Sequence, residues 1–361
     1  MNRNTLLKVL NTAKPFLADQ DFVPILTHFC FEKNHVIAYN DVQAIKLKLD
    51  SPLECAVPGT LLLKMFETVT KDEFTITQGT SEVLISVGKT KITFPFLKKE
   101  SFVFKMPETF NNFPIFLDLN LTSIRGLEKC LISVSPDPVN PEFTGIVWNI
   151  TANNLCLSSS DRKSISTFKQ LLVNNENKES LKIILPKMFC EKLVLLSKEF
   201  IKDDATFRMY FSENEVVATL SPDCTIFTRT IKVTKFVDFE ERLSMFVPNL
   251  ARVLFIDIPF DLGEVLQRAI LILSKLNLGD KRATKVTVQD DQFRFETNSI
   301  MGTSDEFVEL RHPLGTFNFQ IDPTLWKRAC EVTQYISVTP KLILTKSSDE
   351  TFLHAIAHLT L

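Results

Sequence analysis

The sequence predicts an α+β protein built from three repeated domains, each with two helices and several antiparallel strands. First, 361 residues are too many for one typical domain. Second, a proline followed by an amphipathic stretch and then a strand pattern occurs three times, with Pro58, Pro186 and Pro323 lying 128 and 137 residues apart. Third, 45% apolar and 23% charged residues are typical of a globular protein with a sizeable core. We therefore expect domains at residues 1–117, 118–246 and 247–361.

Each repeat is expected to open with an amphipathic helix, starting at Thr5, Leu121 and Asp261. Two alternating segments around a polar turn follow each helix, at residues 27–41, 145–161 and 285–299. This order predicts a helix and then a strand pair in each half of a repeat.

The second helix of each repeat is expected just after its proline, a residue tolerated in a first helical turn. Alternating segments follow at residues 73–94, 206–228 and 341–361. Residues 98–116 and 240–259 are interpreted as linkers. Neither is rich in Gly or Ser, so we expect the domains to be packed together.

The exposed faces of the six expected helices are rich in basic residues. Twelve basic side chains lie opposite the apolar positions: Lys8, Lys14, Lys64, Lys71, Arg125, Lys129, Lys187, Lys198, Lys202, Arg268, Lys275 and Lys327. Five carboxylates share these faces, whereas the whole chain has a net charge of −2. A lysine on one such face is usually only solvated. Repeated over six helices, the pattern predicts a basic surface suited to sequence-independent attraction of phosphates.

Other classes of function lack the residues they need. The five His have no metal-ligand spacing, and no Gly-rich phosphate loop is present. The seven Cys lie far apart without a C-x-x-C pair, which is typical of buried thiols in a reducing compartment. No apolar run approaches the roughly 20 residues of a membrane span. We expect a cytoplasmic protein that is not an enzyme and has no cofactor, metal site or membrane segment.

Several local stretches resemble the bacterial DNA sliding clamp, the β subunit of the replicative DNA polymerase, over essentially the whole chain. The stretch "FVPILTHFCFEKNHVIAYND" is similar to the opening Pro-Ile-Leu strand of that family and the strand after it, with Pro24, Ile25, Leu26 and Asp41 at matching positions. The stretches "LSSSDRKSI", "FTRTIKVTKFVDFEE" and "AIAHLTL" resemble its second-domain turn, its Phe-Pro-Asp-Tyr segment and its terminal strand.

The resemblance implies three clamp-type domains in a ring-forming chain, with helices inside and sheets outside. Two chains would join head to tail around duplex DNA, and short linear peptides would recruit the DNA polymerase and the clamp loader. The twofold dimer would then have about sixfold internal symmetry. A phage-encoded clamp, active in the host cytoplasm, would suit the divergence of the motifs.

The resemblance also implies two sets of contact residues. A partner-peptide pocket between the second and third domains would comprise Phe143, Ser160, Ile165, Val237, Ile356, His358, Leu359 and Leu361. The homodimer would pair an edge strand near Phe104 or Phe116 with the third domain around Ile272, because ring closure removes bare sheet edges. Replacement of the family's Gly-His-Arg and Met-Pro-Met elements predicts an altered peptide preference.

Two alternatives remain open from the sequence. A β-rich structural or scaffold protein could share the threefold repeat without a basic helical surface. A monomeric, open processivity factor would bind DNA without closing a ring. Charge on the helical faces distinguishes the first alternative, and the mass in solution distinguishes the second.

Overall fold

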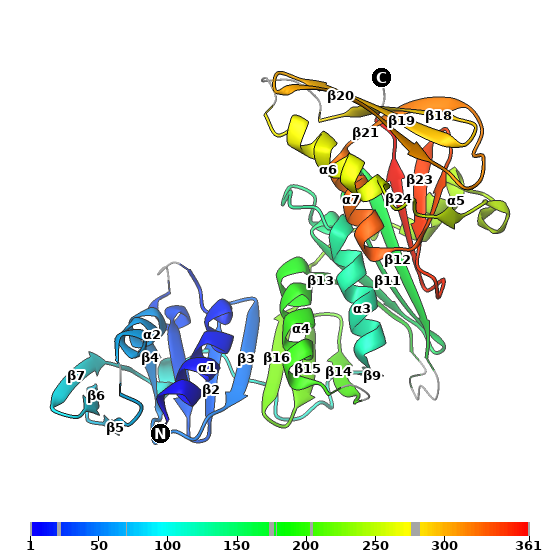
Figure 1. Ribbon diagram of the computed structural model, residues 1–361. Helices are drawn as coiled ribbons and strands as arrows, with labels where there is room; N and C mark the ends of the chain where they lie inside the picture. Colours follow the sequence, from blue (N-terminus) through cyan, green and yellow to red (C-terminus); the bar gives the residue numbers. More distant parts are fainter. Residues whose placement is uncertain are drawn as a thin grey trace. The chain divides into compact units, whose positions relative to one another are not determined.

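The structure is a computed structural model that describes residues 2–19, 23–69, 71–172, 177, 179–202, 205–275 and 282–359 (Figure 1). The chain divides into two compact units. One contains residues 1–121 and 192–230, and the other contains residues 122–191 and 231–361. The division falls within helix α4 (Lys187–Phe200) and separates the two halves of the second repeat.

Each repeat contains two copies of a smaller motif, a helix followed by antiparallel strands. In the first repeat, the first motif is α1 (Arg3–Ala13) with β1 (His28–Glu32), β2 (His35–Tyr39), β3 (Gln43–Lys48) and β4 (Cys55–Pro58). In the second repeat, it is α3 (Leu121–Cys130) with β10 (Gly145–Ile150), β11 (Asn154–Ser160), β12 (Ser164–Leu171) and β13 (Leu181–Pro186). In the third repeat, it is α6 (Leu262–Ile272) with β18 (Thr284–Gln289), β19 (Gln292–Ser299), β20 (Gly302–Glu309) and β21 (Phe317–Ile321). The second motifs are α2 (Gly59–Thr68) with β5 (Thr75–Gln78), β6 (Glu82–Val87) and β7 (Thr90–Pro95); α4 with β14 (Phe207–Phe211), β15 (Glu215–Ser221) and β16 (Cys224–Arg229); and α7 (Pro323–Val332) with β22 (Tyr335–Val338), β23 (Leu342–Lys346) and β24 (Phe352–Ala357). Outside these motifs lie β8 (Leu97–Lys98), β9 (Ile115–Leu119), β17 (Ile256–Asp257) and helix α5 (Phe239–Phe246).

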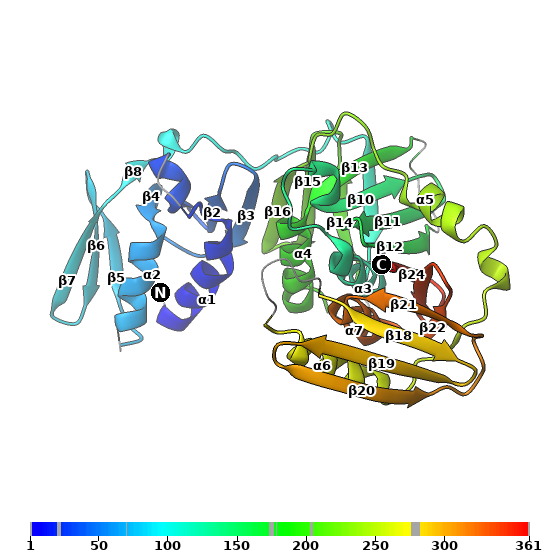
Figure 2. The same cartoon turned by 90° about the horizontal axis from the view of Figure 1, so that it is seen from above.

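The first unit is built on a nine-stranded antiparallel sheet in the order β8-β4-β1-β2-β3-β16-β15-β14-β9. Helices α1 and α2 and the part of α4 that belongs to this unit lie on one face of it (Figures 1 and 2). Helix α1 buries Leu6, Leu10 and Ala13 against the sheet, and the Asn2 side chain caps its first turn. A separate three-stranded sheet has the order β5-β6-β7.

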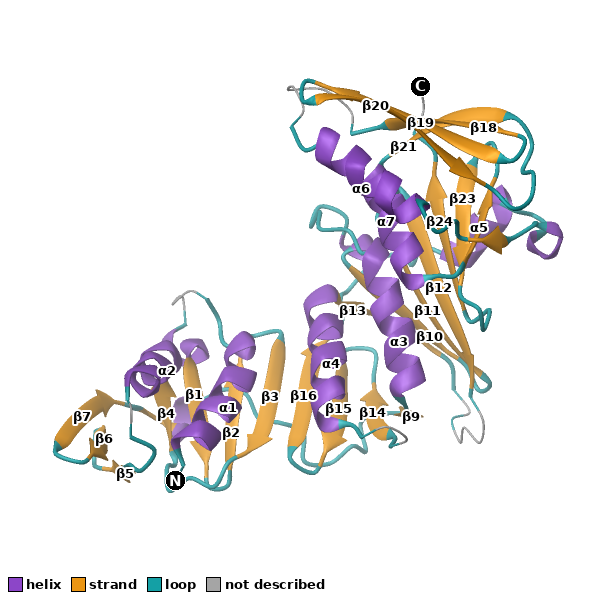
Figure 3. Cartoon of the chain, viewed as in Figure 1, coloured by secondary structure: helices purple, strands orange, loops and turns teal. Residues whose placement is uncertain are grey.

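The second unit contains an eight-stranded antiparallel sheet in the order β13-β10-β11-β12-β24-β23-β22-β17 and a four-stranded sheet in the order β20-β19-β18-β21. Helices α3 and α7 lie on one face of the larger sheet and α5 lies on the other (Figures 2 and 3). Trp326 of α7 is fully buried among Phe293, Phe295 and Phe319 in the core of the third repeat. No helix in the described ranges is both long and apolar enough to cross a membrane.

Two strand junctions connect successive repeats in the same way. In the first unit β3 pairs with β16, with Gln43 opposite Thr228 and Leu47 opposite Cys224. In the second unit β12 pairs with β24, with Ser164 opposite Ile356 and Phe168 opposite Phe352. Each junction joins the third strand of one repeat's first motif to the last strand of the next repeat's second motif.

A buried polar cluster lies beneath the second junction. The Nδ1 atom of His354 is 2.8 Å from the Ser166 hydroxyl and 3.3 Å from that of Ser133, and Ser133 also bonds Ser164 at 2.9 Å. Burial lowers the pKa of His354 to about 3, so this imidazole is neutral near pH 7. Its hydrogen bonds therefore hold β24 to β12 without a buried charge.

The structure confirms the predicted α+β class and corrects several elements. Each strand pair is extended by a third strand (β3, β12 or β20) and by a fourth that runs into the proline (β4, β13) or ends just before it (β21). The second expected linker contains α5, whose first turn is capped by Asp238. Residues 24–27 form a 3-10 turn instead of a strand. The predicted boundary between residues 117 and 118 falls inside β9, which pairs with β14 of the second repeat.

Candidate nucleic acid interface and partner groove

The predicted basic positions of the first unit lie on the exposed sides of its helices. Leu62, Leu63 and Phe66 of α2 are buried, which leaves Lys64 exposed on the opposite side. The other five predicted basic residues of this unit, Lys8, Lys14, Lys71, Lys198 and Lys202, are exposed as well. These lysines lie on or just after helices of the first unit, and their side chains are open to solvent.

Lys8 has a carboxylate partner. The ammonium group of Lys8 is 2.8 Å from Glu199 of α4, and the Lys8 side chain remains 71% exposed. An exposed pair of this kind adds little stability, so Lys8 can exchange Glu199 for a phosphate at small cost. The Lys71 ammonium lies against Gly88 in the β6–β7 turn, and no ion pair of Lys14, Lys64, Lys71 or Lys202 occurs within the described ranges.

In the second unit, several predicted basic residues are engaged by the protein itself. Arg268 lies 2.7 Å from Glu306 and 3.4 Å from Glu264, and the hydrogen bond to Glu306 raises the pKa of its guanidinium. Lys187 pairs with Glu191 at 3.8 Å, and Lys327 pairs with Glu331. The Lys129 ammonium lies 5.5 Å from the centroid of the Phe352 ring. Arg125 and Lys275 are exposed and have no ion pair among the described residues.

Two carboxylates on which these contacts depend were missed by the helix-face count. Glu199 is adjacent to Lys198 in the sequence, so a wider helical face would have included it. Glu306 lies on β20, and only the folded structure brings that strand beside α6. The basic surface is therefore least compensated on the helices of the first unit.

The residues predicted for a partner pocket lie on both faces of the eight-stranded sheet. Alternation along β12 turns Ile165 and Thr167 toward α5, whereas Ser164 and Ser166 face the buried cluster under α3. Along β24, Ala355 pairs with Ile165 and shares the α5 face. Ile356 is fully buried in the core of the third repeat on the opposite face. The prediction that Ile356 lines the pocket is therefore wrong, and its neighbour Ala355 is the one that faces α5.

Three of the predicted pocket residues belong to one apolar cluster. Phe143, Ile165 and Val237 pack together with Phe236 and Phe239. The ring centroids of Phe143 and Phe239 are 6.0 Å apart. Ser160 pairs with Ile165, is almost fully buried and accepts a hydrogen bond from the Arg162 amide. The sequence prediction of a shared apolar floor thus fits the structure for these residues.

A groove of about 740 Å3 opens beside this cluster, between residues 141–142, the segment 232–238 and α5. Val237 and Phe236 contribute to its wall, as do Arg242 and Met245 of α5. The lining includes Lys232, Lys235 and Arg242 as well as Glu142 and Glu241, so it has both signs of charge. The signal that α5 forms one wall was present in the sequence as Asp238 followed by two glutamates, a helix-start pattern.

Residues 358 and 359 contact β21. The His358 ring stacks on Phe319 at 3.9 Å, and the Leu359 amide donates to the Gln320 carbonyl oxygen at 2.8 Å. Burial lowers the pKa of His358 to about 4. His358 and Leu359 therefore support the third repeat, while the predicted pocket residue Leu361 lies outside the described residues.

The predicted dimer residues occupy different environments. Phe104 lies in no strand and stacks on Tyr39 at 4.3 Å, next to Phe227, so it is not on a sheet edge. Phe116 is on the edge strand β9, but this strand belongs to the second repeat. Ile272 ends α6, where its carbonyl oxygen accepts a hydrogen bond from Ser299 of β19.

The sequence matches no family model, nor any curated protein. Solved structures match it along essentially their whole length. A putative DNA polymerase III beta subunit from Eubacterium rectale is 18% identical with a TM-score of 0.83, and the beta subunit from Thermotoga maritima is 16% identical with a TM-score of 0.81; both matches cover 100% of this chain and 98% of theirs. A Helicobacter pylori beta clamp bound to a DNA ligase peptide is 16% identical with a TM-score of 0.81, covering 100% of this chain and 99% of that one. The chain therefore has the fold of these beta subunits.

Proposed function

We propose that this protein is a non-enzymatic DNA sliding clamp, a processivity factor that encircles duplex DNA and tethers the replicative DNA polymerase in the cytoplasm. The observation that carries the proposal is the fold, which is shared with beta subunits over the full length of both chains. A β-rich scaffold is not favoured, because the exposed sides of the first unit's helices carry lysines, as a DNA tether requires. Tethering needs no cofactor, and none is assigned.

The basic helices supply the proposed contact with DNA. Their exposed side chains are mostly lysine, which attracts phosphate as a point charge and reads no base pattern. Contact with phosphates alone lets a protein slide along a duplex. We assign the DNA surface to the predicted basic positions, with Lys14, Lys64, Lys71 and Lys202 as its least compensated members.

Charge reversal tests this assignment. Changing Lys64, Lys71, Lys198 and Lys202 to Glu should weaken association with linear duplex DNA without unfolding, because these side chains are exposed. For every phosphate that is no longer neutralised, the slope of log affinity against log salt should fall by roughly 0.9. A matched variant reverses four exposed lysines on turns and loops, Lys33, Lys105, Lys163 and Lys341, and should keep the wild-type slope. Equal slopes for the two variants would move the DNA surface elsewhere.

We further propose a head-to-tail homodimer that repeats the strand junction once more between copies. The third strand of the third repeat's first motif, β20, and the last strand of the first repeat's second motif, β7, are both sheet edges. They correspond to the paired strands β3 with β16 and β12 with β24. Each chain contains two such junctions, and two more would form between the copies, which gives a ring of six similar segments.

The register of this junction follows from the two that are present. Alignment of the hairpin turns matches Gly302 to Gln43 and Ser164, and matches Phe94 to Thr228 and Ile356. Gly302 would then lie opposite Phe94 of the second copy. One consequence is that Asp305 would lie opposite Lys91, which brings opposite charges together across the junction.

Exposed apolar side chains near β20 support the same contact. Leu271, Ile300, Met301 and Phe307 are each more than half exposed, which is unusual for four large apolar residues on neighbouring segments. Ile272 lies beside them, so this predicted contact residue is kept in the proposal. Phe104 and Phe116 are replaced by β7.

Partner proteins, including the DNA polymerase and the clamp loader, are proposed to bind the groove beside α5 through short linear peptides. Val237 and Phe236 offer an apolar wall, backed by Phe143 and Ile165. Such a surface suits an apolar anchor residue of a peptide. The ligase peptide held by the Helicobacter pylori clamp supports peptide docking for a protein of this fold.

A further inference from the structure

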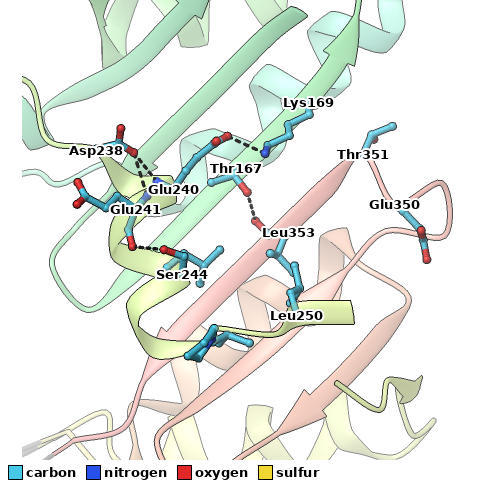
Figure 4. A pocket seen from close by; sticks show the side chains of 13 residues that line it. Thr167, Lys169, Asp238, Glu240, Glu241, Ser244, Leu250, Glu350, Thr351 and Leu353 are labelled. Atoms are coloured by element: carbon cyan, nitrogen blue, oxygen red, sulfur yellow. Dashed lines mark hydrogen bonds and ion pairs between the residues drawn. The ribbon is translucent and has the colours of Figure 1, made fainter. Parts of the chain in front are cut away.

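A second groove lies on the other side of α5. It has a volume of about 630 Å3 and is formed by β12, α5, the segment after α5 and the turn before β24 (Figure 4). Leu243, Val247, Leu250 and Leu353 provide its apolar surface. It shares Asp238 and Glu241 with the first groove but contains none of the residues predicted for the partner pocket.

Carboxylates dominate the polar lining of this second groove. Asp238, Glu240, Glu241 and Glu350 contribute to it, against the single basic residue Lys169. The Lys169 ammonium is held by Glu240 at 3.0 Å, and the Cys156 thiol donates to the same carboxylate at 2.9 Å. Figure 4 shows Lys169 and Glu240 joined in this way at one end, with Glu350 on the opposite wall.

The carboxylates differ in how far they are already satisfied. Asp238 caps α5 by accepting from the amides of Glu240 and Glu241, and Glu350 pairs with Lys346 at 2.6 Å. Within the described residues, the Glu241 side chain has neither an ion pair nor a hydrogen bond. Glu241 lines the groove from α5, where it can pair with a cation of a bound partner.

Exposed apolar residues extend the floor of the groove into solvent. Leu250, which lines the groove, is 39% exposed, and Phe246 at the end of α5 is 57% exposed. Large apolar side chains gathered at an acidic groove are costly to leave in water unless something covers them. The occupant must therefore offer apolar side chains and positive charge together.

We propose that this groove binds a basic and apolar peptide segment of a partner protein, in which Leu or Phe side chains alternate with Lys or Arg. The apolar side chains would pack on Leu243, Leu250 and Leu353, and a cation would pair with Glu241. Complementary charge of this kind fixes the orientation of a segment and excludes acidic competitors. A partner with two segments could occupy both grooves across α5, with an avidity above that of either one.

The test uses the full-length protein and the probe acetyl-Lys-Leu-Lys-Phe-Leu-Lys-amide, labelled with a fluorophore and followed by anisotropy. The double variant Glu241→Gln with Glu350→Gln should weaken binding about fivefold or more at low salt, because two carboxylates of the groove are removed. The matched variant Glu54→Gln with Glu108→Gln neutralises two exposed carboxylates of the first unit and should bind as the wild type does. Equal losses of affinity in the two variants would show that only the net charge of the protein matters, and would overturn the proposal.

Four further arms separate the possible occupants. Leu250→Ser, at a partly exposed position that should not affect folding, should weaken the probe, and acetyl-Lys-Ser-Lys-Ser-Ser-Lys-amide should bind far more weakly. Equal binding of the two peptides would identify a site for cations alone and overturn the proposal. Self-association of the wild type that disappears in the Glu241 and Glu350 variant would show that a second copy is the occupant, and would also overturn it. Val237→Arg, in the other groove, should leave the probe's affinity unchanged.

Discussion

Gly126 illustrates how one position can oppose the preference of its helix. A Cβ atom at Gly126 in α3 would lie 2.4 Å from Cγ of Phe168, a ring that is almost fully buried on β12. The glycine permits close packing of α3 on the sheet at the cost of helix propensity. By contrast, a Cβ atom at Gly263 in α6 would have no neighbouring heavy atom within 4 Å.

These two glycines make a matched pair of substitutions. Gly126→Ala should destabilise the protein by about 1–3 kcal/mol, because the core must shift to admit the methyl group. Gly263→Ala should stabilise it by about 0.5–1 kcal/mol, because alanine favours a helix and the space is open. Denaturant midpoints measure both. A Gly126→Ala variant as stable as the wild type would mean that α3 can move away from Phe168.

His354 makes stability depend on pH. Its pKa is about 3 in the folded protein because of burial, and about 6.5 when unfolded. Below pH 6.5 the unfolded chain binds a proton that the folded chain does not, so stability falls as the pH drops from 6.5 toward 3.

His354→Gln should remove about 2 kcal/mol from the stability difference between pH 7 and pH 5, as a shift of this size requires. The loss of the buried hydrogen bonds would lower stability equally at both pH values, so it would not contribute to this difference. His312→Gln, at an exposed histidine, is the control and should keep the wild-type difference. Unfolding by urea at the two pH values gives the comparison. If His354→Gln kept the wild-type stability difference, the pH dependence would belong to other groups.

Helix α5 shows how one element can create two surfaces. It covers the face of the eight-stranded sheet opposite α3 and α7, and a groove runs along each of its sides. Asp238 begins the helix and contributes to both grooves. The position of α5 therefore decides which residues of β12 and β24 remain accessible.

The groove that contains Val237 can be tested separately from the chain end. Val237→Arg should weaken binding of the cognate polymerase's C-terminal peptide about tenfold or more, because a charge replaces part of an apolar anchor site. Deletion of residues 358–361 should lower stability with little effect on that affinity, because His358 and Leu359 contact β21. Calorimetric titration measures the affinities, and Val103→Arg, at an exposed position of the first unit, is the control. If the deletion weakened peptide binding and Val237→Arg did not, the peptide site would lie at residues 358–361 instead.

For the whole molecule, the proposed junction between β20 and β7 makes a prediction about the assembly. Cysteines at Thr93 and Thr303 in one chain should form disulfides between copies on mild oxidation, because the inferred register sets these residues opposite each other. The pair Thr93→Cys with Phe307→Cys is offset by four residues and should not link.

Two measurements follow the linking. Denaturing gels detect the covalent dimer, and light scattering of the wild type should give twice the mass of 41.2 kDa. A monomer would favour the open processivity factor, and a trimer would require a different closure. Linking of the offset pair alone would show that the strands meet in another register.

The repeated fold could be predicted from the sequence because it depends on local signals. The recurring prolines, the helical spacing of Leu6, Leu10 and Ala13, and the polar turn between β1 and β2 each act over a few residues. The third and fourth strands of each repeat's first motif were missed. Segments such as 43–48 are short and mostly buried, so their pairing partners, more than their own pattern, make them strands.

The basic helical faces were predictable for the same local reason, since exposure on an amphipathic helix follows from its period. The compensation of Arg268 by Glu306 was not predictable, because those residues are 38 positions apart and meet only when β20 packs beside α6. Ile165 and Val237 lie in one apolar cluster, and their contact with a partner peptide stays a prediction. Ile356 was misplaced because a shift of one residue along a strand moves a side chain to the other face of the sheet.

Sequence alone was therefore sufficient for the class, the threefold repeat and the Lys-rich helices, all of which arise from interactions between near neighbours in the chain. The folded chain was needed to establish which strands pair between repeats, and hence which edges stay open at β7 and β20. It was also needed to show that α5 divides one surface into two grooves of different charge. These features depend on contacts between residues far apart in the sequence, whose register no local pattern specifies.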